Sequence, residues 1–287
     1  MSFYAFILVL IASVTHAYWN YLSKQANGKT PFIWLMYIAS VIIYLPFIIW
    51  QLVKTHVDVT LLLIGLGVIS AILRIAYFLL LQTGYRKGDL SVVYPLARGS
   101  GPVFATFGAI FLMHETPTVY SFAGLLLIIT GVLIITKLKI TTGLSTRLKT
   151  GLLYGIATGL FIGCYTVWDK VAVSTYNMQP LQLIFISNMF GAIVLAPGAI
   201  SKMPEIRKEL KLHLRHIIAI AVLSPFSYIL VLIAMQTTPV LYVAPAREIS
   251  ILFGVFMGGR MMNEEDTKRR MFASLFILAG IVCLAFG

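Results

Sequence analysis

Five charged residues lie inside long apolar segments of this chain, and their chemistry is the clearest indication of function. Arg74 lies in the middle of the run IGLGVISAILRIAYFLLL, Arg98 and Arg247 lie in two later runs, Glu248 follows Arg247 directly, and Asp169 lies in another. A charge at membrane depth costs a few kcal/mol, so such residues default to a functional role. Guanidinium groups bind carboxylates and phosphates through paired hydrogen bonds. Because arginines outnumber carboxylates here, we expect a net positive cavity for an anionic group.

Simpler roles remain open for several of these charges. Glu248 also fits as a neutralising partner of Arg98, and Asp169 and Lys170 lie near a helix end, from which they could reach the membrane interface. Arg74 is too central for that, and it has no acidic neighbour in its own segment. A binding or gating role is therefore the expectation for Arg74.

Polar and aromatic residues recur at helical spacing near these charges. Ser13, His16, Asn20 and Ser23 form one stripe in the first apolar segment, with Trp19 beside them. A stripe of this kind faces a bundle interior or a water-filled cavity, although hydrogen bonding between helices would also explain it. The predicted substrate-binding residues are Arg74, Arg98, Arg247, Glu248, His16, Trp19, Asn20, Tyr77, Tyr94 and Trp168. Asp169, Glu248 and His16 are the candidates for coupling to an ion.

The composition predicts that these side chains are positioned by membrane helices. Of the 287 residues, 59% are hydrophobic and 11% are charged, whereas soluble domains have roughly 25% charged residues. Apolar runs near 20 residues recur along the chain, so the fold class is an all-α polytopic membrane protein with ten transmembrane helices. The predicted spans are 3–23, 31–51, 60–83, 90–113, 118–136, 150–172, 180–199, 216–236, 239–258 and 271–286.

The chain repeats itself at three ordered positions. Lys24, Arg98 and Glu115 in the first half correspond to Lys170, Arg247 and Glu264 in the second, and the arginine-to-glutamate spacing is the same (115 − 98 and 264 − 247). We therefore predict a first five-helix repeat at 1–136, a basic connection at 137–149 and a second repeat at 150–287. Because five spans is an odd number, the repeats must be inverted in the membrane.

Prolines lie close to the repeated arginines. Pro95 and Pro102 lie in the fourth predicted span and Pro245 in the ninth, so we expect an interrupted helix in each half. Broken helices at corresponding positions of two repeats point to a binding site at the membrane midplane. Glycines recur at every fourth position of the sixth span, from Gly151 to Gly163. They allow close helix packing, either within the chain or in a homodimer.

The basic residues predict the orientation. The odd-numbered connections carry nearly all Lys and Arg outside the spans, whereas the even-numbered ones carry only Lys54, with Lys170 just inside a helix end. The positive-inside rule then places both termini outside a bacterial or archaeal plasma membrane. The net charge of +12 is explained by these connections, which face anionic lipid, and does not indicate nucleic-acid binding.

The motifs described above resemble the drug/metabolite transporter superfamily, specifically its EamA-type family. The resemblance rests on HAYWNYLSKQA and CYTVWDKVA and on the two proline–arginine blocks, and it covers essentially the whole chain. It implies a central cavity between the repeats, lined mainly by helices one, three and four and their counterparts six, eight and nine, with alternating access. The halves differ in charge, since Arg74 aligns near Ser224 and Glu248 aligns with Gly99. The resemblance does not define the substrate.

The expected function is therefore secondary transport of a small polar metabolite that bears a carboxylate, phosphate or phosphonate. No P-loop, G-x-S-x-G, C-x-x-C or metalloprotease pattern is present, so we predict no enzyme, catalytic residue, metal or cofactor, and an ion or substrate gradient as the energy source. The expected partners are the substrate and membrane lipid, with the chain a monomer or homodimer. A lipid-linked sugar flippase and a non-transporting membrane scaffold are the alternatives.

Overall fold

The computed structural model describes residues 1–26, 28, 30–55, 60–88, 90–135, 146–250, 253 and 267–286. The side chains of some residues within helices, including Lys24 and Tyr94, lie outside this description, as do Glu264 and most of the basic 137–149 connection. The described helices are α1 (Phe3–Ala26), α2 (Thr30–Thr55), α3 (Leu61–Lys87), α4 (Leu90–Met113), α5 (Val119–Ile135), α6 (Thr146–Ser174), α7 (Pro180–Ile200), α8 (Met203–Thr237), α9 (Val240–Ala246) and α11 (Thr267–Phe286).

The described chain is all-helical, as the apolar runs predict. Seven helices, α1 to α4 and α6 to α8, are long and apolar enough to cross a membrane. A helix satisfies every backbone hydrogen bond within one segment, which hydrocarbon requires. Exposed Leu, Ile, Val and Phe side chains cover the outside of the bundle. This protein is therefore a polytopic membrane protein.

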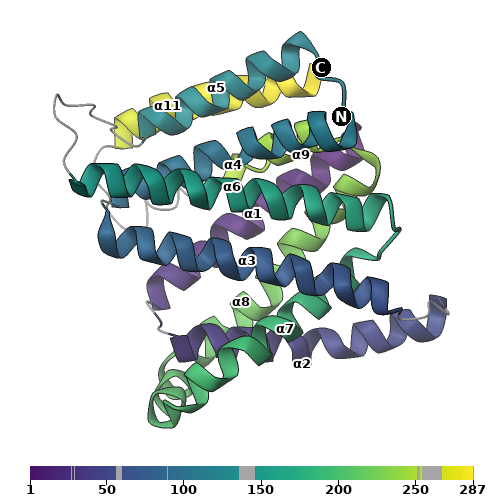
Figure 1. Cartoon of the computed structure of the whole chain (residues 1–287), viewed down its shortest axis with the longest axis vertical. Coiled ribbons are helices and arrows are strands. Elements are labelled where there is room, and N and C mark those ends of the chain that lie inside the picture. The colour runs from purple at the N-terminus through teal and green to yellow at the C-terminus, as the bar shows by residue number, and fades with distance from the viewer. Residues whose placement is uncertain are drawn as a thin grey trace.

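The helix contacts follow an inverted two-fold relation between the halves. Helix α1 packs on α8 as α6 packs on α3, and α2 packs on α8 as α7 packs on α3. Three further contacts join equivalent helices, namely α2 with α7, α4 with α9 and α5 with α11. Figure 1 shows that α1 and α6 run in opposite directions and that both termini lie at the same end of the bundle. The exact domain boundaries at 136 and 150 remain a prediction.

Helices α4 and α6 approach closely because of the glycines in α6. A Cβ on Gly163 would lie 2.6 Å from the Cβ of Phe104, and a Cβ on Gly159 would overlap the side chain of Ser100. Distances below 3 Å leave no room for a methyl group, so the two backbones can meet only where α6 lacks one. The glycine series therefore packs within the chain, and its use in a homodimer is not needed to explain it.

The structure differs from the predictions at two helices and agrees with them at a third. Helix α4 runs without a break from Leu90 to Met113, although Pro95 and Pro102 lie within it, so the first predicted interruption is wrong. The second is present, because α9 ends at Ala246 and the chain turns at Arg247 and Glu248 before it becomes helical again. Helix α8 begins at Met203 rather than near residue 216, and it bends at His213, where φ is −125° and ψ is 16°.

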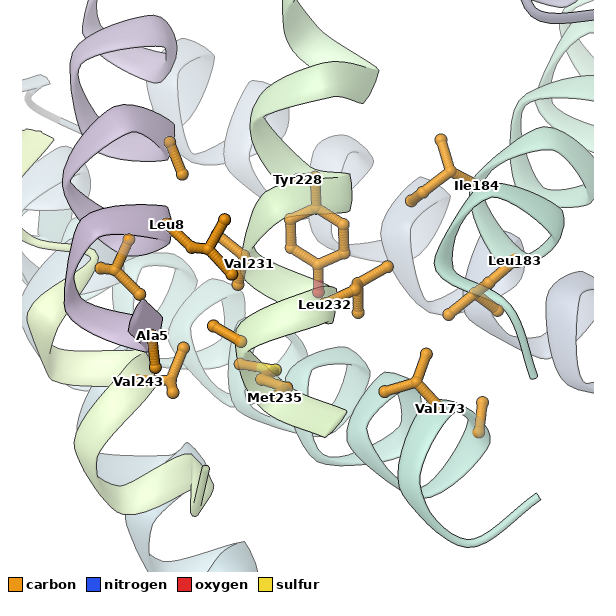
Figure 2. Close-up of a cluster of buried hydrophobic side chains, with 14 of the residues drawn as sticks. Ala5, Leu8, Val173, Leu183, Ile184, Tyr228, Val231, Leu232, Met235 and Val243 are labelled. Carbon is orange, nitrogen blue, oxygen red and sulfur yellow. The ribbon is translucent and has the colours of Figure 1, made fainter. Parts of the chain in front are cut away.

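A buried hydrophobic cluster closes the end of the bundle at which the termini lie. Figure 2 shows Ala5 and Leu8 of α1 against Val231 and Met235 of α8, with Val243 of α9 beside them. Val173 of α6 and Leu183 and Ile184 of α7 extend the same cluster. Burying each large aliphatic side chain contributes roughly 1.5–3 kcal/mol when it is removed from water.

Candidate functional site

Arg74 is held in a network between α3, α6 and α8. Its Nη2 lies 2.7 Å from Asp169 Oδ2, and its Nε donates to Ser70 Oγ at 3.2 Å. The hydroxyl of Tyr228 donates to the same oxygen of Asp169 at 2.8 Å. Asp169 is completely buried, whereas the Arg74 side chain keeps 22% of its surface exposed. The acidic neighbour that Arg74 lacks in its own helix thus comes from the other half of the chain.

Two tyrosines provide aromatic faces for the arginines. The Arg74 guanidinium carbon lies 4.2 Å from the ring centre of Tyr228 and 5.1 Å from that of Tyr165. The Arg247 guanidinium carbon lies 5.1 Å from the Tyr228 ring as well. Cations within about 6 Å of a ring centre are attracted by its π electrons. Tyr228 therefore contacts two arginines with its ring and Asp169 with its hydroxyl.

Arg98 forms the second ion pair between the halves. Its Nη2 lies 3.4 Å from Glu248 Oε2 and donates to Ser250 Oγ at 3.0 Å. Glu248 and Ser250 both follow the end of α9, where the chain turns, and Arg98 lies on α4. The turn thus brings two successive polar side chains to face α4. In both ion pairs the arginine belongs to the first half and the carboxylate to the second.

Arg247 differs from the other two arginines. It follows the last residue of α9, and its backbone N–H donates to Val243 O at 3.1 Å, so it still lies within the helical turn. Within the described ranges it forms no salt bridge, and its guanidinium interacts with Tyr165 and Tyr228. Three guanidinium groups and two carboxylates leave the site with a net charge of +1.

Two small cavities lie on either side of Arg98 and Arg247. The first is lined by α1 and α8 and includes Ser13, His16 and Ser250. The second is lined by α4, α6 and the end of α9, and it includes Glu248 and Thr166. Each cavity is small, with about 10 Å³ of free space, and has room for roughly one water molecule. Arg98 and Arg247 line both of these cavities, whereas Arg74 lines neither of the two.

The polar stripe of α1 is only partly directed at this centre. His16 lines the first cavity, and its ring packs edge-on against Trp19 with 5.0 Å between ring centres. The Trp19 indole N–H is buried without a hydrogen-bond partner among the described atoms, and its ring packs against the cluster around Phe32. Asn20 is exposed and donates to His16 O at 2.7 Å. Of the three predicted residues, His16 is the one that lines a cavity.

The remaining predicted residues have different surroundings. Tyr77 packs against Tyr165, with 5.9 Å between ring centres, and so supports the aromatic residues around Arg74. Trp168 donates from its indole nitrogen to Leu66 O at 2.9 Å, a contact that joins α6 to α3 rather than facing the cavities. The side chain of Tyr94 lies outside the described residues. Whether any of these residues binds substrate stays a prediction.

Sequence reasoning missed Tyr165, Tyr228 and Ser250. Tyr165 begins the YTVWDK motif, so its place one turn before Asp169 was a usable signal. Tyr228 lies three residues after Pro225, and Ser250 lies three residues after Arg247. Serine and tyrosine are common in membrane helices, so their positions in the sequence do not mark Tyr228 and Ser250 as part of the site. The packing of α8 and α9 against α3 and α4 distinguishes these two residues from the other hydroxyl-bearing residues.

Lys170 and Glu115 bind the connection between α8 and α9. Lys170 is buried and donates from Nζ to the carbonyl oxygens of Met235 and Thr238 at the end of α8. Glu115 accepts from the backbone N–H of Val240 at 2.8 Å and of Leu241 at 3.0 Å, at the start of α9. A cation suits the C-terminus of a helix and a carboxylate suits an N-terminus. The side chains of Asp169 and Lys170 are both buried and bonded within the protein, and their depth relative to the membrane interface stays a prediction.

These features define a class of protein, namely a polytopic membrane transporter built from two inverted repeats. The sequence model of the EamA-like transporter family matches residues 3–137 and 149–286, one match in each half. The chain belongs to this family. The resemblance drawn from the duplicated motifs is thereby confirmed.

Two further comparisons agree with this assignment. An uncharacterized protein of Methanocaldococcus jannaschii is 29% identical over 131 residues, which cover 46% of this chain and 95% of that protein. The aligned length is close to that of one repeat. A solved crystal structure superposes with a TM-score of 0.75 over 98% of this chain and 96% of its own, at 11% sequence identity. That likeness shows the fold alone.

Proposed function

We propose that this chain is a secondary transporter that moves a small polar metabolite bearing a carboxylate, phosphate or phosphonate. The observation that carries the proposal is the position of Arg247. It borders both cavities and forms no salt bridge within the described part of the chain. A guanidinium inside the bundle that no carboxylate approaches within salt-bridge distance is costly unless another anion reaches it. The anionic group of the substrate is that partner.

The surroundings of Arg247 suit such a group. Arg98 borders the same two cavities, so a second guanidinium is available for paired hydrogen bonds to an oxyanion. The hydroxyl of Ser13 is buried, has no hydrogen-bond partner among the described atoms and lines the first cavity. His16 supplies a further polar group on the same side. The substrate therefore has an anionic group for the arginines and a hydrogen-bonding group for α1.

Alternating access follows from the way the repeats share the site. Arg98 and Arg247 lie on helices of different repeats, so a rocking motion between repeats would separate or join them. The hydrophobic cluster closes the end of the bundle that holds both termini, and Lys170 and Glu115 bind the α8–α9 connection at this end. Because each cavity admits about one water, the described conformation is a closed one, and substrate entry requires movement.

The proposed transporter has a defined orientation in the membrane and needs an energy source. The C-terminal ends of α2, α4, α6 and α8 lie at the end of the bundle that holds the termini, whereas those of α1, α3, α5 and α7, which precede the basic connections, lie at the other (Figure 1). The termini then lie outside a bacterial or archaeal plasma membrane and the basic connections lie in the cytoplasm. The energy comes from an ion gradient or from the gradient of the substrate. Asp169, Glu248 and His16 are the candidates for ion coupling.

A thermal-shift screen of the purified protein tests this function. Amino acids, phosphonates, sugar phosphates and organic cations would be added singly, and the shift in melting temperature recorded. We expect stabilisation by members of the anionic classes in the wild type, its loss in Arg247→Ala and partial retention in Arg247→Lys. Stabilisation by organic cations alone, or an anion effect that survives Arg247→Ala, would contradict the proposal.

A further inference from the structure

The two ion pairs between the repeats differ in how tightly they are made. Arg74 and Asp169 are 2.7 Å apart, and the paired oxygen of Asp169 also accepts a hydrogen bond from Tyr228, while each arginine has a further hydrogen bond to a serine, Ser70 for Arg74 and Ser250 for Arg98. Arg98 and Glu248 are 3.4 Å apart, and the nearer carboxylate oxygen of Glu248 is buried without a hydrogen bond among the described atoms. Charge-assisted N–H···O hydrogen bonds are usually about 2.7–2.9 Å long. The Arg98–Glu248 pair is therefore the one that an incoming anion can replace.

Arg98 has a cavity on each side of it, and the two cavities differ in chemistry. The first faces α1 and α8 and has hydroxyl groups and His16. The second faces α6, which is the counterpart of α1 in the other repeat, and it contains the Glu248 carboxylate. The two cavities thus differ in charge, because Glu248, whose counterpart in the first repeat is the uncharged Gly99, lies in the second cavity. Arg98 borders both, so it can interact with either an anion in the first or Glu248 in the second.

We propose that Glu248 is the proton-coupling carboxylate and that it competes with the substrate anion for Arg98. This proposal rests on the proposed function above. When an anionic group enters the first cavity, Arg98 turns from Glu248 toward that anion and Arg247. Glu248 then loses its nearest cation. When the entering group is a dianion, Glu248 takes up one proton from the aqueous side to which the cavity opens, so that a carboxylate and a proton become a neutral carboxyl group.

The net charge of the site determines whether Glu248 takes up a proton when a substrate anion binds. Three guanidinium groups and two carboxylates give +1, so a monoanion neutralises the site while Glu248 stays ionised. A dianion would leave −1 in a low-dielectric interior, and one proton on Glu248 restores neutrality. An uncompensated buried charge is strongly unfavourable, which links the proton to the second negative charge of the substrate.

The groups that face Glu248 are consistent with this assignment. Arg98 approaches it from α4, Thr166 from α6 and Arg247 from its own segment. His16 of α1 and Tyr228 of α8 line the first cavity, on the other side of the arginines. Asp169, the other buried carboxylate, keeps Arg74 and Tyr228 as partners and borders neither cavity. Glu248 is thus the acidic group that loses its partner when an anion binds.

Two anions of the same tetrahedral shape test the proposal. Sulfate is a dianion and methanesulfonate a monoanion between pH 5.5 and 8.5, so neither changes its own protonation. Calorimetric titration of the purified wild type in buffers of different ionisation enthalpy counts the protons taken up. We expect about one proton per sulfate and none per methanesulfonate. The sulfate affinity should fall by up to tenfold per pH unit toward alkaline pH, because binding is linked to one proton, whereas the methanesulfonate affinity should not.

Two variants locate the proton. Glu248→Gln should bind sulfate without proton uptake, and Glu205→Gln, a matched change of a glutamate at the start of α8 and outside both cavities, should keep the wild-type stoichiometry. Sulfate binding without a proton in the wild type, the same proton count for both anions, or proton uptake retained in Glu248→Gln would each overturn the proposal and leave the proposed function standing. If neither anion binds the wild type, the proposed anion site itself fails. Should Glu248→Gln not fold, the pH dependence of the two wild-type affinities still decides the outcome.

Discussion

Arg74 on α3 and Asp169 on α6 form a 2.7 Å salt bridge that joins the first repeat to the second. Removing one partner of a buried pair leaves an uncompensated charge and costs about 3–5 kcal/mol. We therefore expect Arg74→Ala to lower the thermal stability of the protein in detergent as well as to abolish transport. Melting curves followed by intrinsic fluorescence would measure the first effect and uptake into proteoliposomes the second.

A double variant separates the two roles of Arg74. In Arg74→Met with Asp169→Leu, apolar side chains of similar size replace both charges, so most of the stability lost in Arg74→Ala should return. Transport should stay absent. A double variant as unstable as Arg74→Ala would show that the ion pair is not what stabilises this contact.

Arg247→Ala should affect substrate binding far more than stability. The substitution breaks no salt bridge among the described residues, and it loses a contact with the Tyr228 ring that is worth roughly 0.5–2 kcal/mol. We expect substrate-induced thermal stabilisation to disappear, while the melting temperature without substrate changes less than in Arg74→Ala. Arg247→Lys keeps the charge but not the paired hydrogen bonds, so it should restore binding only in part. An Arg247→Ala protein that melts like Arg74→Ala would place Arg247 in the structural framework instead.

Two substitutions of Tyr228 separate the contribution of its aromatic ring from that of its hydroxyl group. Tyr228→Phe keeps the aromatic face for Arg74 and Arg247 and loses the hydrogen bond to Asp169, which is worth about 1.5–3 kcal/mol because the acceptor is charged. We expect a lower melting temperature with nearly unchanged substrate affinity. Tyr228→Leu should reduce both, since the aromatic face is lost. Equal substrate affinities in the two variants would rule out a contribution of the ring.

The contacts of Lys170 and Glu115 with the α8–α9 connection should hold this end of the bundle closed. In a background without Cys164 and Cys283, a cysteine at Thr238, whose side chain is buried, reports on opening. We expect Lys170→Met or Glu115→Gln to increase its rate of labelling by a membrane-impermeable maleimide. Lys170→Met removes two hydrogen bonds to the connection, and Glu115→Gln removes one of two together with the negative charge, because an amide NH₂ cannot accept from a backbone N–H. Glu205→Gln, at the opposite end of α8, is the control and should leave the rate unchanged. Unchanged labelling in both variants would contradict the closing role.

Accessibility labelling also tests the proposed orientation. Lys208→Cys lies in the exposed first part of α8, and Tyr176→Cys lies in the exposed α6–α7 connection. In intact cells, an impermeable reagent should label the cysteine at 176 and should reach the one at 208 only after the membrane is opened. The reverse pattern would invert the topology.

The helical spans and the duplication were predictable from the sequence, because both depend on local patterns. Apolar runs of membrane-spanning length and the corresponding positions of Arg98 and Arg247 in the two halves can be recognised in the amino-acid sequence alone. The prolines predicted helix interruptions less reliably. Two of them lie within the unbroken α4, whereas α9 ends directly after Ala246, because tertiary packing decides whether a helix accommodates a lost hydrogen bond.

The sequence by itself determined that this chain is a duplicated membrane protein with more buried arginines than carboxylates. Only the tertiary structure decided which of them meet. Arg74 and Asp169 are 95 residues apart, and Arg98 and Ser250 are 152 apart. Such contacts depend on the rotation and depth of each helix against its neighbours, which no pattern within one helix defines. The same packing left Arg247 without a salt bridge in the described chain and placed it beside the cavities.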